Sequence, residues 1–326
     1  MQAAIRERYG SSEVVELRQI ERPAPKDDEV LVRVRAASVN RADLDGLKPR
    51  PGFIRLFMGV RRPRDQRLGI DVAGEVEAVG SAVTRFTPGD RVFADLFSHG
   101  QGSFAEYVSA PEKAFLPIPA TMSFDVAATL PNSAILAIQG LRSRGGQTIR
   151  GGDKVLIDGA SGNVGPFAVQ IAKALGAEVT GTCRTEKVEF VRSIGADHVI
   201  DFTAVDYTRE PERYDWILDT DSHHSITACR RALRPRGRYV TLGAGSLGVF
   251  LALLAGTAVS VATARKAGLM LWWRPFDAQD IGTITGLIEA GKVVPAIDRR
   301  YPLSEVVDAL RHVDEGRARG KILVIP

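Results

Sequence analysis

Cysteine is scarce in this chain, whose 326 residues include only two, Cys183 and Cys229. Two thiols cannot build a disulfide framework, and without a Cys-x-x-Cys pair nothing indicates a zinc-finger type of site. The N-terminal segment is charged from Arg6 onward and has no apolar core of the kind that a secretory signal needs. A reduced, cytoplasmic setting is therefore the expected one.

Charge of one sign is not concentrated in any part of the chain. The 43 basic residues are interleaved with 39 acidic ones, and the formal net charge is +4. A nucleic-acid-binding protein should instead carry a basic stripe or a recognisable module, so no nucleic-acid partner is expected. We interpret the densest basic run, residues 55–67, as a solvated loop, with an anion-attracting rim as the alternative.

A long and strongly apolar segment is also missing. The uncharged stretch 248–264 reaches only the short limit for a membrane-spanning helix, and it is rich in Ala, Gly, Ser and Thr. It predicts a buried or subunit-facing helix, and no membrane span is expected.

The composition that remains is typical of a folded globular protein, with 44% hydrophobic and 25% charged residues. A chain of this length fits two domains. Its first part alternates polar and apolar residues between Gly and Pro turns, which predicts a small barrel or sandwich. The strands expected there cover residues 13–20, 29–39, 71–79, 91–94 and 103–108.

Helical spacing begins near Phe124, and strands then alternate with helices. Such alternation predicts a parallel sheet covered on both faces. The expected strands cover residues 154–158, 178–182, 198–202, 215–219, 238–242 and 321–325. The expected helices cover residues 124–141, 164–175, 187–194, 225–233, 277–290 and 303–313.

The strongest single signal is a glycine-rich loop, GASGNVG at residues 159–165, placed between an expected strand and an expected helix. Glycines at these places permit a tight turn, close approach of the backbone to a pyrophosphate, and close packing of the helix on the strand. The helix N-terminus also attracts phosphate. We predict dinucleotide binding, and the alternative is a glycine-rich turn that binds no ligand.

The second strand of the expected parallel sheet bears on which dinucleotide binds. An acidic residue typically ends this strand in NAD-binding proteins. Here the strand runs through Thr182 to Arg184, and Lys187 follows one turn later. Because a guanidinium suits a 2′-phosphate, the pattern favours NADP(H) over NAD(H). The alternative is that both basic side chains are simply exposed to solvent.

Several further motifs are distributed along nearly the full length of the chain. They are AASVNRAD (36–43), LGIDVAGEV (68–76), PGDRVF (88–93), GSFAEY (102–107), GADHVID (195–201) and GKILV (320–324). With the glycine loop, they resemble the medium-chain dehydrogenase/reductase superfamily, in particular its zinc-free zeta-crystallin-like quinone oxidoreductase branch.

The resemblance implies an α/β fold of two domains. A GroES-like, mostly-β catalytic domain is expected from residues 1–120 and 265–326, and a Rossmann domain with a doubly wound parallel sheet from residues 121–264. The resemblance also implies a homodimer and a cleft that holds the nicotinamide. The insert 48–67 and the stretch 248–264 are candidate walls for an apolar substrate, and core packing explains them equally well.

The zinc-dependent alcohol dehydrogenases of the superfamily differ at the metal. They carry a catalytic Cys where this chain has Asn40 and a His where it has Ile70, and their four-cysteine structural lobe is absent here. Zinc prefers thiolate and imidazole ligands in tetrahedral number. The adjacent pair His223 and His224 does not supply such a set, so no metal site is expected.

Missing zinc ligands favour quinones or α,β-unsaturated carbonyls as small apolar substrates. Hydride transfer to these compounds leaves an enolate or phenolate, which is much less basic than an alkoxide and needs no Lewis acid. NADPH-dependent reduction of such a substrate is the expected activity. The alternatives are a zinc-free alcohol or aldehyde oxidoreductase on the same scaffold, and a cofactor-binding sensor or structural protein with little turnover.

Asn40 and Asp43 are the expected catalytic residues. Asn40 is expected to hydrogen-bond near the substrate carbonyl or the nicotinamide ribose, and Asp43 to orient its loop. A turn residue and a helix cap are the respective alternatives. The residues assigned to the cofactor are the glycine loop, the second strand with the turn after it, and three later positions: Gly159, Ala160, Ser161, Gly162, Asn163, Val164, Gly165, Thr182, Arg184, Lys187, Leu242, Gly243 and Lys321.

Four positions depart from the pattern of the family. Asn163 replaces a second glycine, for which local backbone strain or a small shift is expected. Phe202 replaces a tyrosine that helps to hold the 2′-phosphate in some members, and Leu136 replaces a threonine beneath the nicotinamide, with Asn132 and Ser133 nearby. Asp45 stands where a tyrosine sometimes faces the substrate, so the role of that tyrosine does not transfer.

Overall fold

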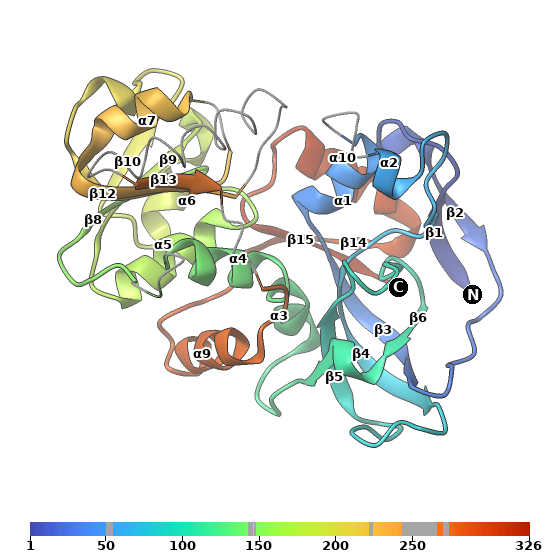
Figure 1. Cartoon of the computed structure of the whole chain (residues 1–326). Coiled ribbons are helices and arrows are strands. Elements are labelled where there is room, and N and C mark those ends of the chain that lie inside the picture. The colour runs from blue at the N-terminus through green and yellow to red at the C-terminus, as the bar shows by residue number, and fades with distance from the viewer. Residues whose placement is uncertain (50–54, 143–145, 147, 222–223, 243–265, 270–273) are drawn as a thin grey trace. The chain divides into compact units, whose positions relative to one another are not determined.

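The structure is a computed structural model that describes residues 1–326 except 50–54, 143–145, 147, 222–223, 243–265 and 270–273. It divides into two compact units (Figure 1). Unit 1 comprises Met1–Ser133, Pro275–Ile281 and Ile297–Pro326, and unit 2 comprises Ala134–Arg274 and Gly282–Ala296. Each unit has its own sheet and its own core.

Unit 1 is built on a seven-stranded sheet with the order β14-β15-β3-β4-β5-β7, and β6 also pairs with β3. The long strand β3 pairs antiparallel with β4, β6 and β15. A separate two-stranded sheet joins β1 and β2. The strands are β1 Gln2–Arg6, β2 Val15–Gln19, β3 Glu29–Val39, β4 Asp71–Val79, β5 Arg91–Asp95, β6 Tyr107–Pro111, β7 Phe115–Pro117, β14 Ile297–Pro302 and β15 Lys321–Ile325.

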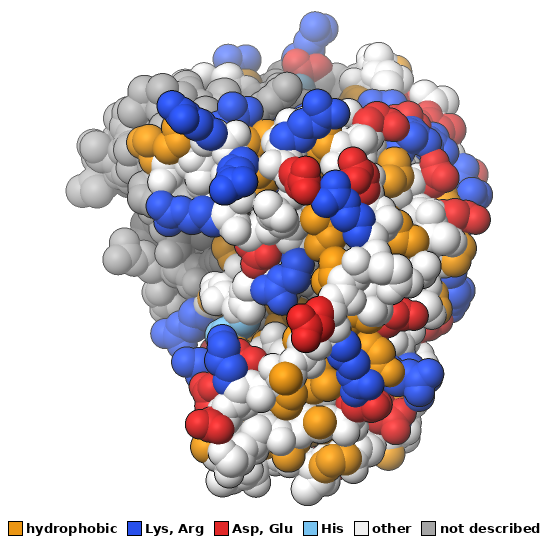
Figure 2. Space-filling view, turned by 90° about the vertical axis from the view of Figure 1, so that its right-hand side faces the viewer, with side chains coloured by type: hydrophobic (Ala, Val, Ile, Leu, Met, Phe, Trp, Pro, Cys, Tyr) orange, Lys and Arg blue, Asp and Glu red, His pale blue; other side chains and the backbone are white. Residues whose placement is uncertain are grey.

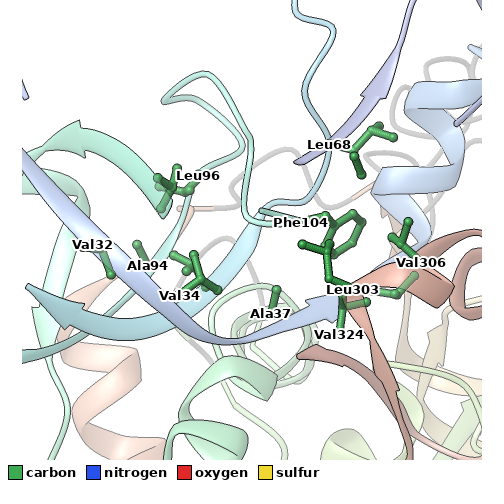
Figure 3. Packing of buried hydrophobic residues seen from close by; sticks show 14 of the residues in the cluster. Val32, Val34, Ala37, Leu68, Ala94, Leu96, Phe104, Leu303, Val306 and Val324 are labelled. Carbon is green, nitrogen blue, oxygen red and sulfur yellow. The ribbon is translucent and has the colours of Figure 1, made fainter. Parts of the chain in front are cut away.

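The core of unit 1 follows from the alternation of β3, whose Val30, Val32 and Val34 are buried while Arg33 and Arg35 are exposed. Figure 3 shows part of this core, in which Phe104 and Leu303 belong to one buried cluster. The helices of unit 1 are α1 Arg41–Leu47, α2 Arg55–Met58, α3 Phe124–Thr129 and α10 Val306–Asp314. Short 3₁₀ helices cover Ser12–Val14, Glu112–Ala114 and Leu303–Glu305.

Unit 2 contains a six-stranded parallel sheet with the order β10-β9-β8-β11-β12-β13. Its strands are β8 Lys154–Asp158, β9 Glu178–Cys183, β10 His198–Asp201, β11 Tyr214–Asp219, β12 Leu233–Thr241 and β13 Lys266–Leu269. The strand order runs outward in both directions from β8, as in a doubly wound dinucleotide-binding sheet. The expected fold class is therefore confirmed.

Helices connect the parallel strands of unit 2. The connecting helices are α5 Gly165–Ala174, α6 Val188–Ser193 and α7 Ile226–Ala232. Helix α4 Ser133–Gly140 precedes the first of these strands and α9 Ala278–Glu289 follows the last, and each includes residues assigned to both units. Short 3₁₀ helices cover Thr185–Lys187 and Tyr207–Arg209.

The structure has two helices where the sequence predicts a single helix over residues 124–141. Helix α3 ends at Thr129 and α4 begins at Ser133. Pro131 lies between them, and it interrupts the helix because it has no N–H to donate and its ring clashes with the carbonyl group of the preceding turn, although Leu130 before it keeps helical backbone (φ −86°, ψ −41°). The strand expected at 103–108 is also shifted, because β6 covers Tyr107–Pro111.

The unit boundaries differ from the expected domain boundaries as well. Residues 121–133 belong to unit 1, because α3 packs on β3 and β4. Residues 282–296 belong to unit 2, where Gln170 hydrogen-bonds the backbone of Val294 on both its N–H and its C=O. Strand β13 also lies in unit 2, because it extends the parallel sheet beside β12.

Two expectations about the surface can be compared with the described residues. Among these residues, no helix is both long and apolar enough to cross a membrane. The uncharged stretch 248–264 lies outside the described residues. On the face drawn in Figure 2, the coloured basic side chains are interspersed with acidic ones.

Candidate functional site

The glycine loop lies between β8 and α5, as the sequence predicts. Gly159 has a φ of +82°, and a Cβ there would lie 2.4 Å from Thr220 Oγ1. A Cβ on Gly165 would lie 2.4 Å from the carbonyl oxygen of Gly159 and 2.5 Å from that of Ala160. The first and third glycines are therefore required by the turn and by the packing of the helix against it.

The middle glycine, Gly162, is different. Its φ lies outside the left-handed range, and an added Cβ would meet only the carbonyl oxygen of Gly159, at an ordinary contact distance of 3.5 Å. The fold therefore has room for a side chain at Gly162. A glycine there leaves the backbone open to close approach by a ligand, which is the role that a dinucleotide-binding loop gives its second glycine.

The N-terminus of α5 adds to this fit. Its N-cap residue, Val164, makes no side-chain cap hydrogen bond, and Pro166 occupies the first turn. An uncapped helix N-terminus offers N–H groups and a favourable dipole to phosphate. Asn163 has no positive φ, since the non-glycine residues with positive φ in the described part of the chain lie elsewhere. Its replacement of glycine therefore introduces no left-handed backbone strain.

The loop is held from below by Thr182 at the end of β9. Thr182 Oγ1 accepts the Gly159 N–H at 3.0 Å, and its carbonyl oxygen accepts the Ala160 N–H at 2.9 Å. Thr182 and Ala160 are both fully buried, and Ser161 is 8% exposed. Two residues assigned to the cofactor, Thr182 and Ala160, thus have internal partners and fix the shape of the loop.

The basic residues after β9 lie in one turn. Arg184 is exposed and precedes the 3₁₀ helix Thr185–Lys187, whereas Lys187 is only 5% exposed. An acidic residue, Asp201, ends the neighbouring strand β10, and its carboxylate accepts hydrogen bonds from Thr185 and Thr203. Those hydrogen bonds lower the pKa of Asp201. Arg184 is therefore the basic side chain that this turn presents to solvent.

Leu242 follows β12, and its N–H donates to the Asp219 carbonyl oxygen at 3.0 Å. Gly243 lies outside the described residues. Phe202 follows β10, with its N–H on the Cys183 carbonyl oxygen at 3.1 Å. These contacts place Leu242 and Phe202 after the carboxyl ends of their strands, the edge at which an open α/β sheet binds ligands.

A second group of site residues lies in unit 1. Ser38 pairs with Asp71 across β3 and β4, and Val39 pairs with Ile322 across β3 and β15. This register brings Asn40, at the end of β3, next to Asp71 and Lys321, which open their strands. We call Asn40, Asp71, Ser133 and Lys321 the Asn40 cluster. Each of its members is at most 1% exposed.

Hydrogen bonds connect the members of the Asn40 cluster. Lys321 Nζ donates to Asn40 Oδ1 at 2.6 Å and to Ser133 Oγ at 3.0 Å, and it lies 3.5 Å from Asp71 Oδ2. Ser133 Oγ also donates to Asn40 Oδ1, at 3.2 Å, and Asn40 Nδ2 donates to the Ser38 carbonyl oxygen at 3.3 Å. These contacts fix the orientation of the Asn40 amide. Lys321, assigned to the cofactor, is here an internal partner of Asn40.

Asp43 borders this cluster. Its Oδ2 accepts the Asn40 N–H at 2.8 Å, which fixes the start of α1. Burial raises the pKa of Asp43 to about 8, and the Asn40 N–H opposes the rise. Asp95, paired with Asp71 across β4 and β5, also has a pKa raised by burial, to about 7, and the neighbouring Asp71 adds to this rise.

The central pair of the cluster shows opposite shifts. Burial raises the pKa of Asp71, and Lys321 opposes that rise. Burial also lowers the pKa of Lys321, and Asp71 and Asp43 oppose that change. Buried charges of this kind are stable only when they are paired and hydrogen-bonded. The cluster therefore depends on Lys321 as the basic partner of its carboxyl groups.

The positions that bind zinc in the alcohol dehydrogenases have different chemistry here. Ile70 is 1% exposed and apolar, and the amide of Asn40 is hydrogen-bonded within its cluster. Within the described part of the chain, no group of three or more His, Cys, Asp or Glu residues could hold a metal ion. His224 instead contacts Tyr207, with ring centroids 4.8 Å apart. His223 lies outside the described residues.

Sequence reasoning missed Asp71 and Ser133 as partners of Asn40, and Asp158 beneath the glycine loop. Asp71 carried a usable signal, because an acidic residue followed directly by Val72, Ala73 and Gly74 is expected to be buried with them and must then be paired. Asp45, by contrast, is exposed and pairs with Arg41 at 3.3 Å. Leu136 lies within α4 and is half-buried.

The spare room at Gly162 leads to a test. We expect Gly162→Ala to leave stability unchanged or to raise it by about 0.4–1 kcal/mol, because the substitution restricts the unfolded chain. The same methyl group should weaken NADPH binding about tenfold or more, which corresponds to about 1.4 kcal/mol. Thermal unfolding and a fluorescence titration with NADPH measure the two effects. Unchanged affinity would show that no ligand approaches Gly162 closely.

Comparisons with known proteins agree with this geometry. Residues 26–120 match the family described as alcohol dehydrogenase GroES-like domain, and residues 194–324 match the one described as zinc-binding dehydrogenase. The chloroplast envelope quinone oxidoreductase homolog of Arabidopsis thaliana is 33% identical over 315 residues, which cover 94% of this chain and 93% of that protein. The mitochondrial NAD(P)H oxidoreductase RTN4IP1 of Mus musculus is 34% identical over 361 residues, which cover 99% of this chain and 89% of that protein.

A solved structure extends the agreement to the whole fold. The quinone oxidoreductase from Coxiella burnetii superposes with a TM-score of 0.85 at 26% identity, and the match covers 100% of this chain and 99% of that one. The chain therefore belongs to the zinc-free quinone oxidoreductase branch of the medium-chain dehydrogenase/reductase superfamily, and it is an oxidoreductase.

Proposed function

We propose that this enzyme uses NADPH, without zinc, to reduce a quinone or an α,β-unsaturated carbonyl compound. The observation that carries the proposal is the glycine loop, where Gly162 leaves room that the fold does not need beside the uncapped N-terminus of α5. The relatives named as quinone oxidoreductases support a quinone as substrate, and the relative named as an NAD(P)H oxidoreductase supports a reduced nicotinamide nucleotide as cofactor.

The residues of the chain have separate tasks in this proposal. The backbone of the glycine loop and the first turn of α5 bind the diphosphate. Arg184 binds the 2′-phosphate through its planar, bidentate guanidinium. When bound, the nicotinamide supplies the hydride, and the protein supplies position and electrostatics.

The Asn40 cluster provides a preorganised polar group in unit 1. Lys321 and Ser133 both donate to Asn40 Oδ1, so the side-chain amide cannot rotate freely. One N–H of the amide is used by Ser38, and an amide nitrogen carries two. Asn40 also hydrogen-bonds the Asp71 carboxylate, which opposes the rise that burial causes in the pKa of Asp71. The Asn40 amide, held in this way, is the group that we assign to the substrate carbonyl or the nicotinamide ribose. A donor held in place before reaction pays no reorganisation cost as charge develops.

The nucleotide preference is tested at Arg184. We expect Arg184→Gln to weaken NADPH binding about 10- to 100-fold, since hydrogen bonds to charged groups contribute about 1.5–3 kcal/mol. NADH affinity should be nearly unchanged, because NADH lacks the 2′-phosphate. Arg209→Gln, at an exposed arginine of the same unit, is the matched control. Parallel titrations with the two nucleotides measure the preference. An unchanged preference for NADPH would show that Arg184 does not bind the 2′-phosphate.

The reaction class is tested by NADPH oxidation with quinones, 2-alkenals and alcohols or aldehydes as separate substrates. We expect turnover with the first two groups, at a rate unaffected by prior treatment with a metal chelator. Turnover confined to alcohols or aldehydes would favour the other oxidoreductase activity on this scaffold. Tight NADPH binding with no turnover on any substrate would favour a sensor or structural role.

A further inference from the structure

A buried polar group lies directly beneath the glycine loop of unit 2. Asp158 ends β8 immediately before Gly159 and is 2% exposed. Its Oδ1 accepts a hydrogen bond from Thr182 Oγ1 at 2.5 Å, and its Oδ2 accepts one from Tyr207 at 3.0 Å. Thr182 Oγ1 in turn accepts the Gly159 N–H at 3.0 Å. A continuous path of hydrogen bonds thus connects the Asp158 carboxyl group to the first amide of the loop.

A second carboxyl group lies beside Asp158. Asp219 ends β11 and is the register partner of Asp158 on the neighbouring strand, and it is fully buried. Its Oδ2 accepts the Tyr239 hydroxyl at 2.5 Å, and its Oδ1 accepts the Asp221 N–H at 3.0 Å. Two buried acidic side chains therefore end adjacent strands at the edge of the sheet that carries the loop.

Placing a carboxyl group in this position is costly for the fold. An ionised carboxylate that leaves water must recover its lost hydration through hydrogen bonds and opposite charge. The described residues give Asp158 two hydroxyl donors, from Thr182 and Tyr207, and no ion pair. Its negative charge is therefore only partly compensated, and it lies next to a loop shaped for an anion.

We propose that Asp158 is a positioning residue of the dinucleotide loop, and that it couples nucleotide binding to the uptake of one proton. Through Thr182 it fixes the Gly159 amide, and through its own charge it opposes a diphosphate on the loop. The inference rests on the proposed dinucleotide function. It adds a role for a residue that touches neither nucleotide nor substrate.

The electrostatic reasoning has a definite sign. A diphosphate brings negative charge toward a carboxylate in a region of low dielectric, which favours the neutral acid. Binding therefore raises the affinity of Asp158 for a proton, and by linkage a protonated Asp158 raises the affinity of the loop for the nucleotide. The proton comes from solvent and returns to solvent when the nucleotide leaves.

The hydrogen-bond pattern accommodates both charge states. In the ionised state, Thr182 and Tyr207 both donate to Asp158. When Asp158 Oδ2 carries a proton, it donates to the Tyr207 oxygen, and the Tyr207 hydroxyl turns to Cys229 Sγ, which lies 3.4 Å away. Thr182 keeps its bonds to Oδ1 and to the Gly159 N–H, so the loop geometry is preserved in both states.

The groups that face Asp158 are consistent with its role as the proton acceptor. Burial, with the neighbouring Asp219 adding to it, raises the pKa of Asp158 to about 6. Burial also raises the pKa of Tyr207 and Tyr239, and that of Cys229 to about 12, so these three stay protonated at neutral pH. The remaining titratable neighbours are Asp219 and His224, whose ring packs on Tyr207.

The test measures proton uptake and affinity on the full chain. Calorimetric titrations with NADH and with NADPH are run from pH 6 to pH 8, in two buffers that differ in ionisation enthalpy. NADH is decisive, because it lacks the 2′-phosphate that itself titrates in this range. For the unmodified protein we expect proton uptake when NADH binds. The affinity for NADH should fall as the pH rises, by up to tenfold per pH unit, which is the limit for one proton.

Variants then assign the proton. Asp158→Asn should remove both the proton uptake and the pH dependence, and at pH 8 it should bind NADH more tightly than the unmodified chain does. Thr182→Val should weaken binding at pH 6, because Gly159 loses its acceptor, and it should also move the midpoint of the pH dependence upward, because Asp158 loses a donor. Glu189→Gln, at an exposed carboxylate of the same unit, and His224→Gln should both keep the pH dependence.

A second variant covers the case in which Asp158→Asn does not fold. Tyr207→Phe removes a donor to the ionised carboxylate, so the midpoint of the pH dependence should move upward by about one unit. The inference is overturned if binding takes up no proton, if Asp158→Asn keeps the original pH dependence, or if Tyr207→Phe leaves the midpoint in place. Failure of both nucleotides to bind at any pH would instead overturn the proposed function.

Discussion

Replacing Lys321 with methionine is expected to lower the free energy of unfolding by about 3–5 kcal/mol, the usual cost of leaving one member of a buried ion pair without its partner. Lys321 is 1% exposed and is the basic partner of Asp71, which is fully buried. Methionine has a similar length and fills the space, so the loss reports charge and hydrogen bonding more than volume. Denaturant unfolding measures it.

The loss should depend on pH with a definite sign. Burial holds the pKa of Asp43 at about 8 and that of Asp95 at about 7, and it raises the pKa of Asp71. A carboxyl group with a raised folded-state pKa contributes stability that is full below its unfolded pKa of about 3.9 and is lost as the pH rises through the folded value. Without Lys321 these values rise further, so Lys321→Met should be more destabilised at pH 8 than at pH 5.

A double variant provides the control. Adding Asp71→Asn to Lys321→Met removes the unpaired charge and should recover a large part of the lost stability, since contacting residues are strongly coupled. The single variant Asp71→Asn completes the comparison. If the stability losses of Lys321→Met and Asp71→Asn simply add in the double variant, the pair is not energetically coupled, and our description of the Asn40 cluster is wrong.

Gly165→Ala is expected to have the largest effect on nucleotide binding. The new methyl carbon would lie 2.4–2.5 Å from three backbone atoms of Gly159 and Ala160, which are not free to move as a flexible side chain would be. Overpacking of this kind costs about 1–3 kcal/mol of stability. The shifted loop should lose two or more charge-assisted hydrogen bonds to the diphosphate, which weakens NADPH binding about 100-fold or more.

Gly162→Ala is the matched control for this variant, because it adds the same methyl group in the same loop without a backbone clash. Thermal unfolding should separate the two variants clearly, with only Gly165→Ala destabilised. Equal stabilities would mean that the helix and the turn do not pack as tightly as the structure indicates.

Strand positions were largely predictable, because period-two alternation is a local property of the chain. Strands β3, β4 and β15 begin and end at the residues that the sequence predicts. The break between α3 and α4 was missed because helical spacing continues across it. Pro131 was the available signal, and its consequence is functional, since Ser133 then begins a new helix beside Asn40.

The two parts of the site differ in how far sequence alone could reach. The loop at 159–165 is contiguous, and its glycines follow from local backbone geometry, so its location and the roles of Gly159 and Gly165 were predicted. The Asn40 cluster joins residues that are 281 positions apart along the chain, as Asn40 and Lys321 are. No local pattern specifies such a contact, and resemblance to a family assigned Lys321 to the cofactor without its buried partners.

Thr182 illustrates a further limit. The sequence placed Thr182 in the second strand of the parallel sheet and assigned it to the cofactor. Its hydroxyl is directed inward by Asp158 of the neighbouring strand, whose carboxylate accepts the hydrogen bond that the hydroxyl donates. The side-chain role therefore follows from strand pairing and not from the position in the sequence.

The most direct test of the whole account follows the backbone amides of residues 159–165 by nuclear magnetic resonance as NADPH is added. We expect the resonances of Val164 and Gly165 to shift most strongly and their hydrogen exchange to slow, because these are the groups that we propose face the diphosphate, whereas the Gly162 N–H already donates to the Gly159 carbonyl oxygen at 3.1 Å. If NADPH binds and these amides do not respond, the nucleotide site lies elsewhere and the account is contradicted.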